Sequence, residues 1–395
     1  MLVSPEGNHM LASQRGLFDL PRDICYLNSA SFSPLPLSSQ EAGRAAVGRK
    51  ARPWTLDPSF AFGQYERARQ AAARLIDAEA RDIALISSIS YGVATAARLV
   101  TIPRGARVLV LQNDHSSPVL EWRSRSKAQG FAIETVRRPD DGDWTSAVLS
   151  AIERPAAPPL ALASISSVHW SDGGLIEVMK IAEALRRHGA LFLIDATQSA
   201  GVLAMDVKSL DPDFVIFPTY KWLLGPYGRA FLYVARRHQD GIPIEQTSYG
   251  RRDVRSDNAE YLADTRYVSD ASRFDMGERD HFISMEMASI GMEMMAEWGP
   301  AAVAERLAML NDRIADGLLA SAVHLPDRRF RAPHILSLGF AEGVPAGLVE
   351  GLAAEGIYVA KRLTRMRVSP HVFNDEQDAD RFAAALATRL QAARP

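Results

Sequence analysis

Short apolar runs alternate with amphipathic stretches over the first 250 residues. Buried strands are predicted at 107–112, 131–136, 160–166, 191–194 and 214–217, and the segment 83–100 predicts a strand, a turn and a helix. Residues 61–77 and 176–190 carry apolar side chains at helical spacing, so both are predicted helices. This alternation favours an α/β fold with a mostly parallel, doubly wound sheet. The apolar run 229–235 is predicted to be its antiparallel edge.

Two of these strands end near charged side chains. Leu191–Ile194 is followed by Asp195, and Phe214–Phe217 is followed closely by Lys221. In open α/β sheets the carboxyl ends of the strands form the ligand-binding edge, so the two charges are expected together. An amine and a carboxylate placed there suit pyridoxal phosphate (PLP), because the amine condenses with its aldehyde and the carboxylate keeps the ring nitrogen protonated. The alternative is a helix-capping aspartate and a solvated lysine.

The sequence segments around the two charged residues favour the PLP hypothesis. DATQSAG at 195–201 and TYKWLLGPYG at 219–228 resemble the cofactor segments of the class V aminotransferase family. These are PLP enzymes of fold type I, and they include cysteine desulfurases, kynureninase and isopenicillin epimerase-like proteins. The resemblance implies a large PLP-binding domain, a smaller C-terminal α/β domain, and a homodimer with its active site at the subunit interface.

Composition restricts the possible partners and location. The 395 residues are 47% hydrophobic and carry a net charge of −2, which predicts neither a nucleic-acid partner nor a membrane surface. No apolar run approaches the ~20 residues of a membrane span, and the amino terminus has no apolar core of the signal-peptide type. The single cysteine, Cys25, excludes a disulfide and a cysteine zinc site, and no metal site is predicted. A reducing, cytoplasmic location is therefore expected.

Three segments are predicted from the order of these elements. Residues 1–40 form an amino-terminal arm and a substrate-pocket loop, 41–272 the large PLP-binding domain, and 273–395 a linking helix and the small domain. Methionines repeat along the linking helix, and core packing explains them better than a ligand role.

The resemblance implies two groups of phosphate contacts. Ser90 and Tyr91 lie in a polar turn before a helix expected to begin at about Val93, and a helix amino terminus attracts anions. The alternative is a turn that only caps the helix. Thr219 and Tyr220 precede the lysine, as phosphate-contacting residues do in kynureninase-like members.

Three more positions match cofactor contacts of the family. His115 occupies the place of the residue stacked over the pyridine ring, although a histidine after a strand is often structural. The family often has asparagine where this chain has Pro118, so the loop here is open to a different course. Trp170 lies where relatives keep a residue beside the cofactor oxygen or the substrate, and Gln198 matches a residue that bonds the phenolic oxygen.

Substrate contacts are implied at both ends of the chain. Asn28 to Ser31 match a segment that borders the substrate pocket in relatives. Arg367 takes the position of the arginine that clamps the substrate α-carboxylate, and its planar fork suits bidentate recognition. Arg365 is the alternative for that role.

The predicted catalytic residues are Lys221 and Asp195. The freed lysine amine acts as the base at Cα. Persulfide-forming cysteine desulfurases need a thiol in the small domain, and Cys25 lies at the opposite end of the chain. An aminotransferase is therefore predicted first. A lyase that performs β-elimination, C–S or C–C cleavage, or an epimerase, is the alternative.

Two other classes are disfavoured. A non-catalytic regulator of this fold carries an added DNA-binding domain, for which the residues before Asn28 leave no room. A nucleotide-binding α/β enzyme would carry a G-x-G-x-x-G or Walker motif, and neither follows the first strand.

Overall fold

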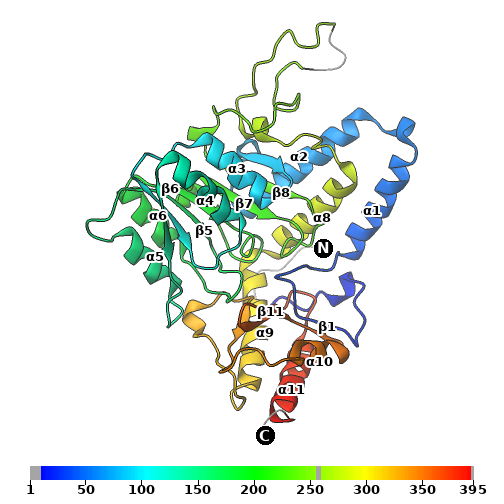
Figure 1. The fold of residues 1–395 in the computed structure, drawn as a ribbon. Helices are drawn as coiled ribbons and strands as arrows, with labels where there is room; N and C mark the ends of the chain where they lie inside the picture. The colour runs from blue at the N-terminus through cyan, green and yellow to red at the C-terminus, as the bar shows by residue number, and fades with distance from the viewer. Residues whose placement is uncertain (1–9, 255–258, 393–395) are drawn as a thin grey trace.

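The computed structural model describes residues 10–254 and 259–392 (Figure 1). Within these residues, the largest sheet has seven strands in the order β2-β8-β7-β6-β5-β3-β4. They are β2 (Ile83–Ile86), β3 (Arg107–Leu111), β4 (Ala132–Val136), β5 (Leu160–Ser166), β6 (Leu191–Asp195), β7 (Phe214–Pro218) and β8 (Ala230–Val234). From β7 to β4 all neighbours pair in parallel. The predicted mostly parallel α/β sheet is confirmed.

The strand predicted at the antiparallel edge lies inside the sheet, so that prediction is wrong. β8 pairs antiparallel with β7 on one side and with β2 on the other. β2 is the edge strand, and a later segment covers it: Leu85 N donates to Asp275 Oδ1 at 2.8 Å and Met276 N donates to Leu85 O at 2.9 Å. All five residues of β8 are buried, which agrees with an interior position.

Helices cover both faces of this sheet, and the strand residues alternate between the two hydrophobic layers. Buried side chains of α3 (Ile89–Leu99) and α4 (Ser117–Gln129) pack on one face. The other face packs against α2 (Pro58–Leu75), α5 (Trp144–Ile152), α6 (Val178–Arg187) and α7 (Val207–Leu210). α1 (Leu37–Lys50) and α2 pack in turn on α8 (Phe282–Trp298), whose buried methionines lie in the core.

One helix begins earlier than predicted. The helix expected from about Val93 starts at Ile89, because the Ser88 side chain caps it by accepting a hydrogen bond from Tyr91 N at 3.2 Å. Ser90 and Tyr91 therefore belong to the first turn of α3 and not to the turn before it.

A second unit is formed by both ends of the described chain (Figure 1). β9 (Leu336–Leu338), β11 (Ala360–Arg362) and β12 (Arg365–Val368) form an antiparallel sheet in the order β11-β12-β9, with α9 (Pro300–Gly317), α10 (Leu348–Ala354) and α11 (Glu376–Ala392) around it. β1 (Cys25–Tyr26) pairs in parallel with β10 (Ile357–Tyr358), so the amino-terminal segment lies beside the carboxyl-terminal residues.

The boundaries predicted at residues 40 and 272 stay predictions. Residues 1–9 of the predicted arm and 255–258 of the predicted large domain lie outside the described residues. No helix in the described ranges is long and apolar enough to cross a membrane.

Candidate active site

β6 and β7 deliver Asp195 and Lys221 to the same edge of the sheet. Asp195 is the last residue of β6, and Lys221 follows β7 in a tight loop. In this loop Thr219 Oγ1 donates to Pro226 O at 2.7 Å and Gly225 N donates to Thr219 O at 2.9 Å. A Cβ on residue 225 would lie 2.6 Å from Thr219 Cβ, so only glycine lets the loop close this tightly.

Lys221 lines a cavity of about 400 Å³. Its wall combines residues from the amino-terminal segment, the carboxyl ends of the large sheet and the small sheet. The lining residues are Ala30, Ser31, Phe32, Asp114, His115, Ser116, Trp170, Tyr220, Lys221, Tyr227, Arg362 and Arg367. Five predicted site residues, Lys221, His115, Trp170, Tyr220 and Arg367, therefore meet in one place.

Lys221 is held as a reactive amine. Its residue is 7% exposed, and its Nζ lies 5.5 Å from the centre of the Tyr220 ring. The pKa of this amine is lowered to about 7: burial is the largest cause, the positive charge of Arg367 adds to the effect, and Asp195 partly offsets both. A large fraction of the amine is therefore neutral and nucleophilic near neutral pH.

Asp195 is a buried carboxylate that can accept from a cationic N–H. It is 2% exposed, and Thr197 N donates to its Oδ1 at 2.9 Å. Burial raises the pKa of this carboxyl, the nearby charge of Asp114 adds to the rise, and the bonds from Thr197 oppose it. A cationic partner would stabilise the ionised form in this position.

Arg367 is fixed at the opposite wall. Its Nη1 donates to Trp170 O at 2.6 Å and its Nη2 donates to Ser31 Oγ at 2.7 Å. The residue is 1% exposed, and its buried Nε has no hydrogen-bond partner among the described residues. The pKa of Arg367 is lowered to about 9, mainly by burial and also by the positive charge of the neighbouring Arg362. This guanidinium is well placed to receive an anion.

Arg365, the alternative clamp, is engaged elsewhere. Its Nε donates to Ser337 Oγ at 2.7 Å and its Nη2 donates to Ser337 O at 3.1 Å. It does not line the cavity, and the structure brings Arg367 to the lysine instead.

His115 and Trp170 form one wall together. Their rings meet edge to face at 6.1 Å with an interplanar angle of 88°, and Trp170 Nε1 donates to Asn113 O at 2.7 Å. Asp114 fixes the same loop, since its Oδ1 accepts from Ser166 Oγ at 2.6 Å and its Oδ2 accepts from Ser166 N at 3.1 Å.

Six other predicted residues do not line the cavity: Asn28, Ser90, Tyr91, Asp195, Gln198 and Thr219. Asn28 lies behind it, where its Oδ1 accepts from Ser31 Oγ at 2.7 Å. The Gln198 amide is used on both sides, donating to Ala30 O at 3.2 Å and accepting from Trp222 Nε1 at 2.7 Å. Their cofactor and substrate roles stay predictions.

The two residues of the α3 turn have partners of their own. Ser90 Oγ lies 3.1 Å from Ser88 Oγ. The Tyr91 hydroxyl faces the Glu245 carboxylate, and burial followed by that charge raises the pKa of this phenol. A phosphate contact at this turn stays a prediction.

Five lining residues were not predicted from the sequence: Phe32, Asp114, Ser116, Tyr227 and Arg362. Phe32, Tyr220 and Tyr227 form a cluster of three rings, with ring centres 5.7 Å apart for Phe32 and Tyr220, 4.4 Å for Tyr220 and Tyr227, and 6.0 Å for Phe32 and Tyr227. Asp114 directly precedes His115 in the loop after a strand, so its position in the sequence could have indicated a place in the site. The two aromatic residues reach the site only through long-range packing.

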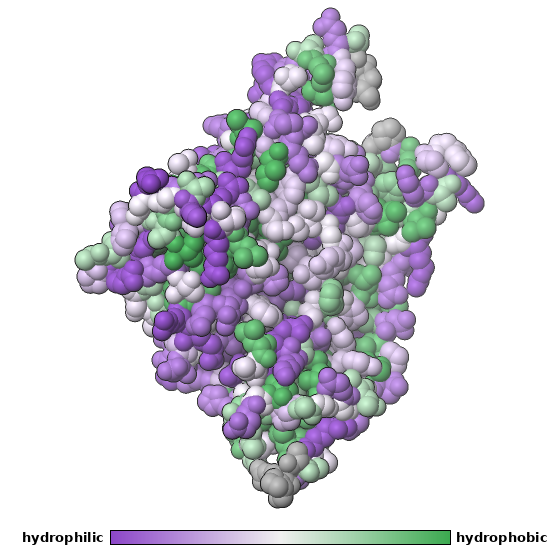
Figure 2. Space-filling model, in the orientation of Figure 1, coloured by the Kyte–Doolittle hydropathy of each residue, from purple (hydrophilic) through white to green (hydrophobic). Residues whose placement is uncertain are grey.

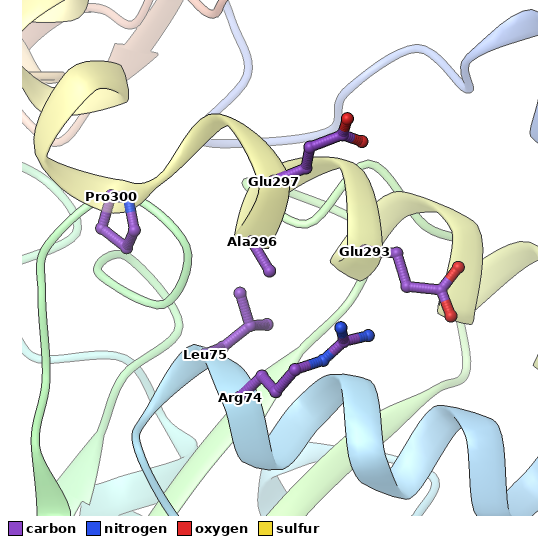
Figure 3. A pocket seen from close by; sticks show the side chains of 6 residues that line it. All are labelled: Arg74, Leu75, Glu293, Ala296, Glu297 and Pro300. Atoms are coloured by element: carbon purple, nitrogen blue, oxygen red, sulfur yellow. The ribbon is translucent and has the colours of Figure 1, made fainter. Parts of the chain in front are cut away.

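A larger cavity of about 780 Å³ lies elsewhere, between α2 and α8 (Figure 3). Figure 3 shows Arg74 of α2 directed toward α8, which contributes Glu293. The remaining lining residues are Leu75, Ala296, Glu297 and Pro300. This lining contains no lysine amine that could condense with an aldehyde, so the smaller cavity at Lys221 is the candidate active site.

Comparison with known proteins identifies the family. The family model described as "Aminotransferase class-V" matches residues 57–382. The chain belongs to the class-V aminotransferase family. It is 26% identical over 333 residues to the uncharacterized aminotransferase YcbU of Bacillus subtilis, covering 80% of this chain and 82% of that protein. It is 24% identical over 395 residues to isopenicillin N epimerase of Streptomyces clavuligerus, covering 94% and 96%.

Solved structures support the same fold. A cysteine desulfurase of Thermococcus onnurineus superposes with a TM-score of 0.80 at 20% identity, covering 96% of this chain and 97% of that one. The cystine C–S lyase C-DES superposes with a TM-score of 0.81 at 18% identity, covering 93% and 98%. The predicted fold type I architecture and family are therefore confirmed.

The residues of the cavity fit the cofactor of this class-V family. Lys221 supplies a buried amine whose pKa is lowered to about 7, and Asp195, at the end of the neighbouring β6, supplies a buried acceptor for a ring N–H. The protein is a PLP-dependent enzyme.

Proposed function

We propose that this enzyme is an aminotransferase acting on an α-amino acid. The observation that carries the proposal is the pairing of Lys221 with Arg367 in one cavity. An amine that can hold or release a proton near neutral pH thus faces a fixed guanidinium. An α-amino acid presents its Cα proton and its carboxylate at matching positions, one for each residue.

Each residue has a separate task in the proposed reaction. PLP, when bound, supplies the electron sink that weakens the bonds at Cα. Lys221 takes the proton from Cα and returns it elsewhere, Asp195 holds the proton of the ring nitrogen, and Arg367 orients the carboxylate. His115 and Trp170 would form the wall of the cavity beside the bound cofactor.

Persulfide transfer is not proposed, although several relatives are named cysteine desulfurases. Cys25 is the only cysteine of the chain, and it is fully buried with its Sγ 3.4 Å from Asp378 O. Burial raises the pKa of this thiol well above its ordinary value. A buried protonated thiol outside the cavity cannot receive sulfur from a substrate there.

The test follows the amino nitrogen. Holoenzyme is incubated with a panel of ¹⁵N-labelled amino acids and an unlabelled keto acid, and products are read by mass spectrometry. An aminotransferase moves the label into a new amino acid. Label released as ammonia would contradict the proposal and assign a lyase, and Cα–deuterium exchange with no nitrogen loss would assign an epimerase.

We also propose that the enzyme is a cytoplasmic homodimer with the active site near the subunit interface. Support comes from exposed apolar side chains on α1, α2 and the turn between them: Leu37, Val47, Trp54 and Phe62. Figure 2 shows hydrophobic surface over this lobe. A face with several large exposed apolar side chains is typical of a protein interface. The single buried thiol agrees with a reducing compartment.

A further inference from the structure

Two guanidiniums meet at one hydroxyl in the wall of the cavity. Arg362 Nη2 and Arg367 Nη2 both donate to Ser31 Oγ, at 2.6 Å and 2.7 Å. The proton of that hydroxyl goes to Asn28 Oδ1 at 2.7 Å. With one proton donated and two bonds accepted, Ser31 has no free capacity, and it holds the two cations side by side.

Neither cation is neutralised by a carboxylate in the described part of the chain. Among the described residues, no carboxylate forms an ion pair with Arg362 or Arg367, whereas most other buried arginines here have such a partner; Arg69, for example, binds Asp275 at 2.7 Å. Two like charges held together in a partly buried wall repel each other. That repulsion is relieved when anions enter the cavity.

The two arginines differ in a way that assigns them separate anions. Arg367 is 1% exposed and is fixed by Trp170 O, so it receives the group nearest the reacting carbon. Arg362 is half-buried at the cavity wall, and its Nη1 donates to the carbonyl of its neighbour Lys361 at 2.9 Å. Its position suits a group further along the substrate.

We propose that the substrate is an α-amino acid with a second anionic group on a short side chain, with its α-carboxylate on Arg367 and its side-chain anion on Arg362. This inference rests on the proposed function, since it names the substrate class of the same cavity. The side chain must be short because both Nη2 atoms bond the same oxygen, which limits the distance between the two anions.

The experiment compares charged and neutral amino acids of equal size. Holoenzyme is titrated with aspartate, cysteate and asparagine, which carry a carboxylate, a sulfonate and a neutral amide at similar distances. Apparent dissociation constants come from the change in cofactor absorbance, and kcat/KM is measured in parallel. Calorimetry with succinate and butyrate adds a readout that requires no reaction, because neither compound has an amine.

We expect the wild type to bind aspartate and cysteate more tightly than asparagine, with apparent dissociation constants lower by about tenfold to a hundredfold. This factor corresponds to the binding free energy of one hydrogen-bonded charge pair. Arg362→Gln should bring this ratio close to one by weakening only the anionic ligands, and should remove the preference for succinate over butyrate. Lys361→Gln is the matched control, since it removes one exposed positive charge from the same strand, β11. It should keep both preferences.

Two results would overturn the inference. One is a wild type with equal affinity for aspartate, cysteate and asparagine. The other is an Arg362→Gln variant in which the binding of asparagine is weakened as much as the binding of aspartate. That result would mean that both arginines hold the α-carboxylate. A site that responds to no amino acid, yet binds succinate in an Arg362-dependent way, would uphold the two-anion site and refute the proposed function alone.

Discussion

Arg367 Nη1 donates a 2.6 Å hydrogen bond to the carbonyl oxygen of Trp170. The arginine comes from β12 of the small sheet and the tryptophan from the loop after β5 of the large sheet, so this bond joins the two units at the cavity. The indole of the same tryptophan meets His115 edge to face. The arginine that would orient a substrate therefore also fixes the wall against which a cofactor ring would lie.

The first prediction concerns substrate recognition by Arg367. Arg367→Ala should weaken binding of amino acids to the holoenzyme by at least about tenfold, because a charged hydrogen-bonding partner is lost. Binding of an amine that lacks the carboxylate should change far less. Absorbance titrations with both ligands measure the difference.

Arg365→Ala is the control for that experiment. It removes the same charge from the same strand, but its guanidinium bonds Ser337 outside the cavity. It should affect both ligands equally and weakly. An Arg367→Ala loss of the same size for the amine and the amino acid would disprove the clamp.

The central part of this site could be predicted from local sequence. Asp195 and Lys221 each follow an apolar strand, and parallel strands carry such residues to one edge without further information. The interior position of β8 could not be predicted that way. It depends on pairing with β2, more than a hundred residues earlier, and an apolar run fits an edge and an interior strand alike.

Side-chain directions were harder to predict than strand positions. The turn with Ser90 and Tyr91 was recognised, but Tyr91 faces Glu245, which lies in the connection after the large sheet. Gln198 was recognised in the cofactor segment, yet its amide joins Ala30 to Trp222. In both cases distant partners decide the orientation, and local sequence does not name them.

A second prediction tests the proposed dimer. Trp54 is 80% exposed at the lobe of α1 and α2, and Trp54→Asp would place a charge in the proposed interface. The dimer dissociation constant should rise by about tenfold or more, as for a large aromatic interface residue. Light scattering over a dilution series measures it.

The matched control uses a residue at the other end of the molecule. Leu319 is 74% exposed just after α9, so Leu319→Asp adds the same charge to an equally exposed position. The molecular mass of the Leu319→Asp variant should change with dilution in the same way as that of the wild type. A Trp54→Asp variant with unchanged mass at all concentrations would place the interface elsewhere or exclude it.

The third prediction concerns a buried ion pair beneath the Trp170 loop. Asp172 Oδ1 lies 3.1 Å from His169 Nδ1, its Oδ2 accepts from Arg138 Nε at 2.6 Å, and Trp144 stacks on the imidazole at 4.8 Å. Burial opposes ionisation of Asp172, but bonds from His169 and Arg138 outweigh it and hold the pKa of this carboxyl well below its usual range.

Asp172→Asn should therefore lower the free energy of unfolding by about 1–3 kcal/mol. The pKa of Asp172 is lowered in the folded protein. Its contribution to the unfolding free energy is therefore complete when the pH is above the unfolded pKa of about 3.9, and it is lost as the pH falls. The pKa of His169 is raised, mainly by Asp172 against the opposing effect of burial, so its share is complete below about 6.5 and is lost as pH rises. The loss of unfolding free energy in the Asp172→Asn variant should therefore be largest between about pH 3.9 and pH 6.5.

Urea unfolding from about pH 3 to 8 measures that profile. Asp327→Asn is the control, because Asp327 forms an exposed pair with Arg329 and such pairs contribute little. A deficit for Asp172→Asn that stays constant down to pH 3 would mean that the lost charge is not its cause.

The last prediction follows the protonation of Lys221. The neutral amine is the form that attacks the aldehyde of PLP, and the pKa of this amine is lowered to about 7. The rate of cofactor uptake by apoenzyme should therefore rise with pH and level off above about 7, where an ordinary lysine would still be rising. Borohydride should then fix the cofactor on the peptide that contains Lys221, and Lys221→Ala should lose both uptake and label.

The same profile tests why the pKa is low. Arg367→Gln removes a positive charge that favours the neutral amine, so the pKa of Lys221 should rise and the uptake curve should move to higher pH. Arg365→Gln should leave the curve in place, because that guanidinium bonds Ser337 outside the cavity. If both variants moved the curve equally, general surface charge would be its cause. If neither did, burial alone would set the pKa of the lysine, and the arginine would act on the substrate only.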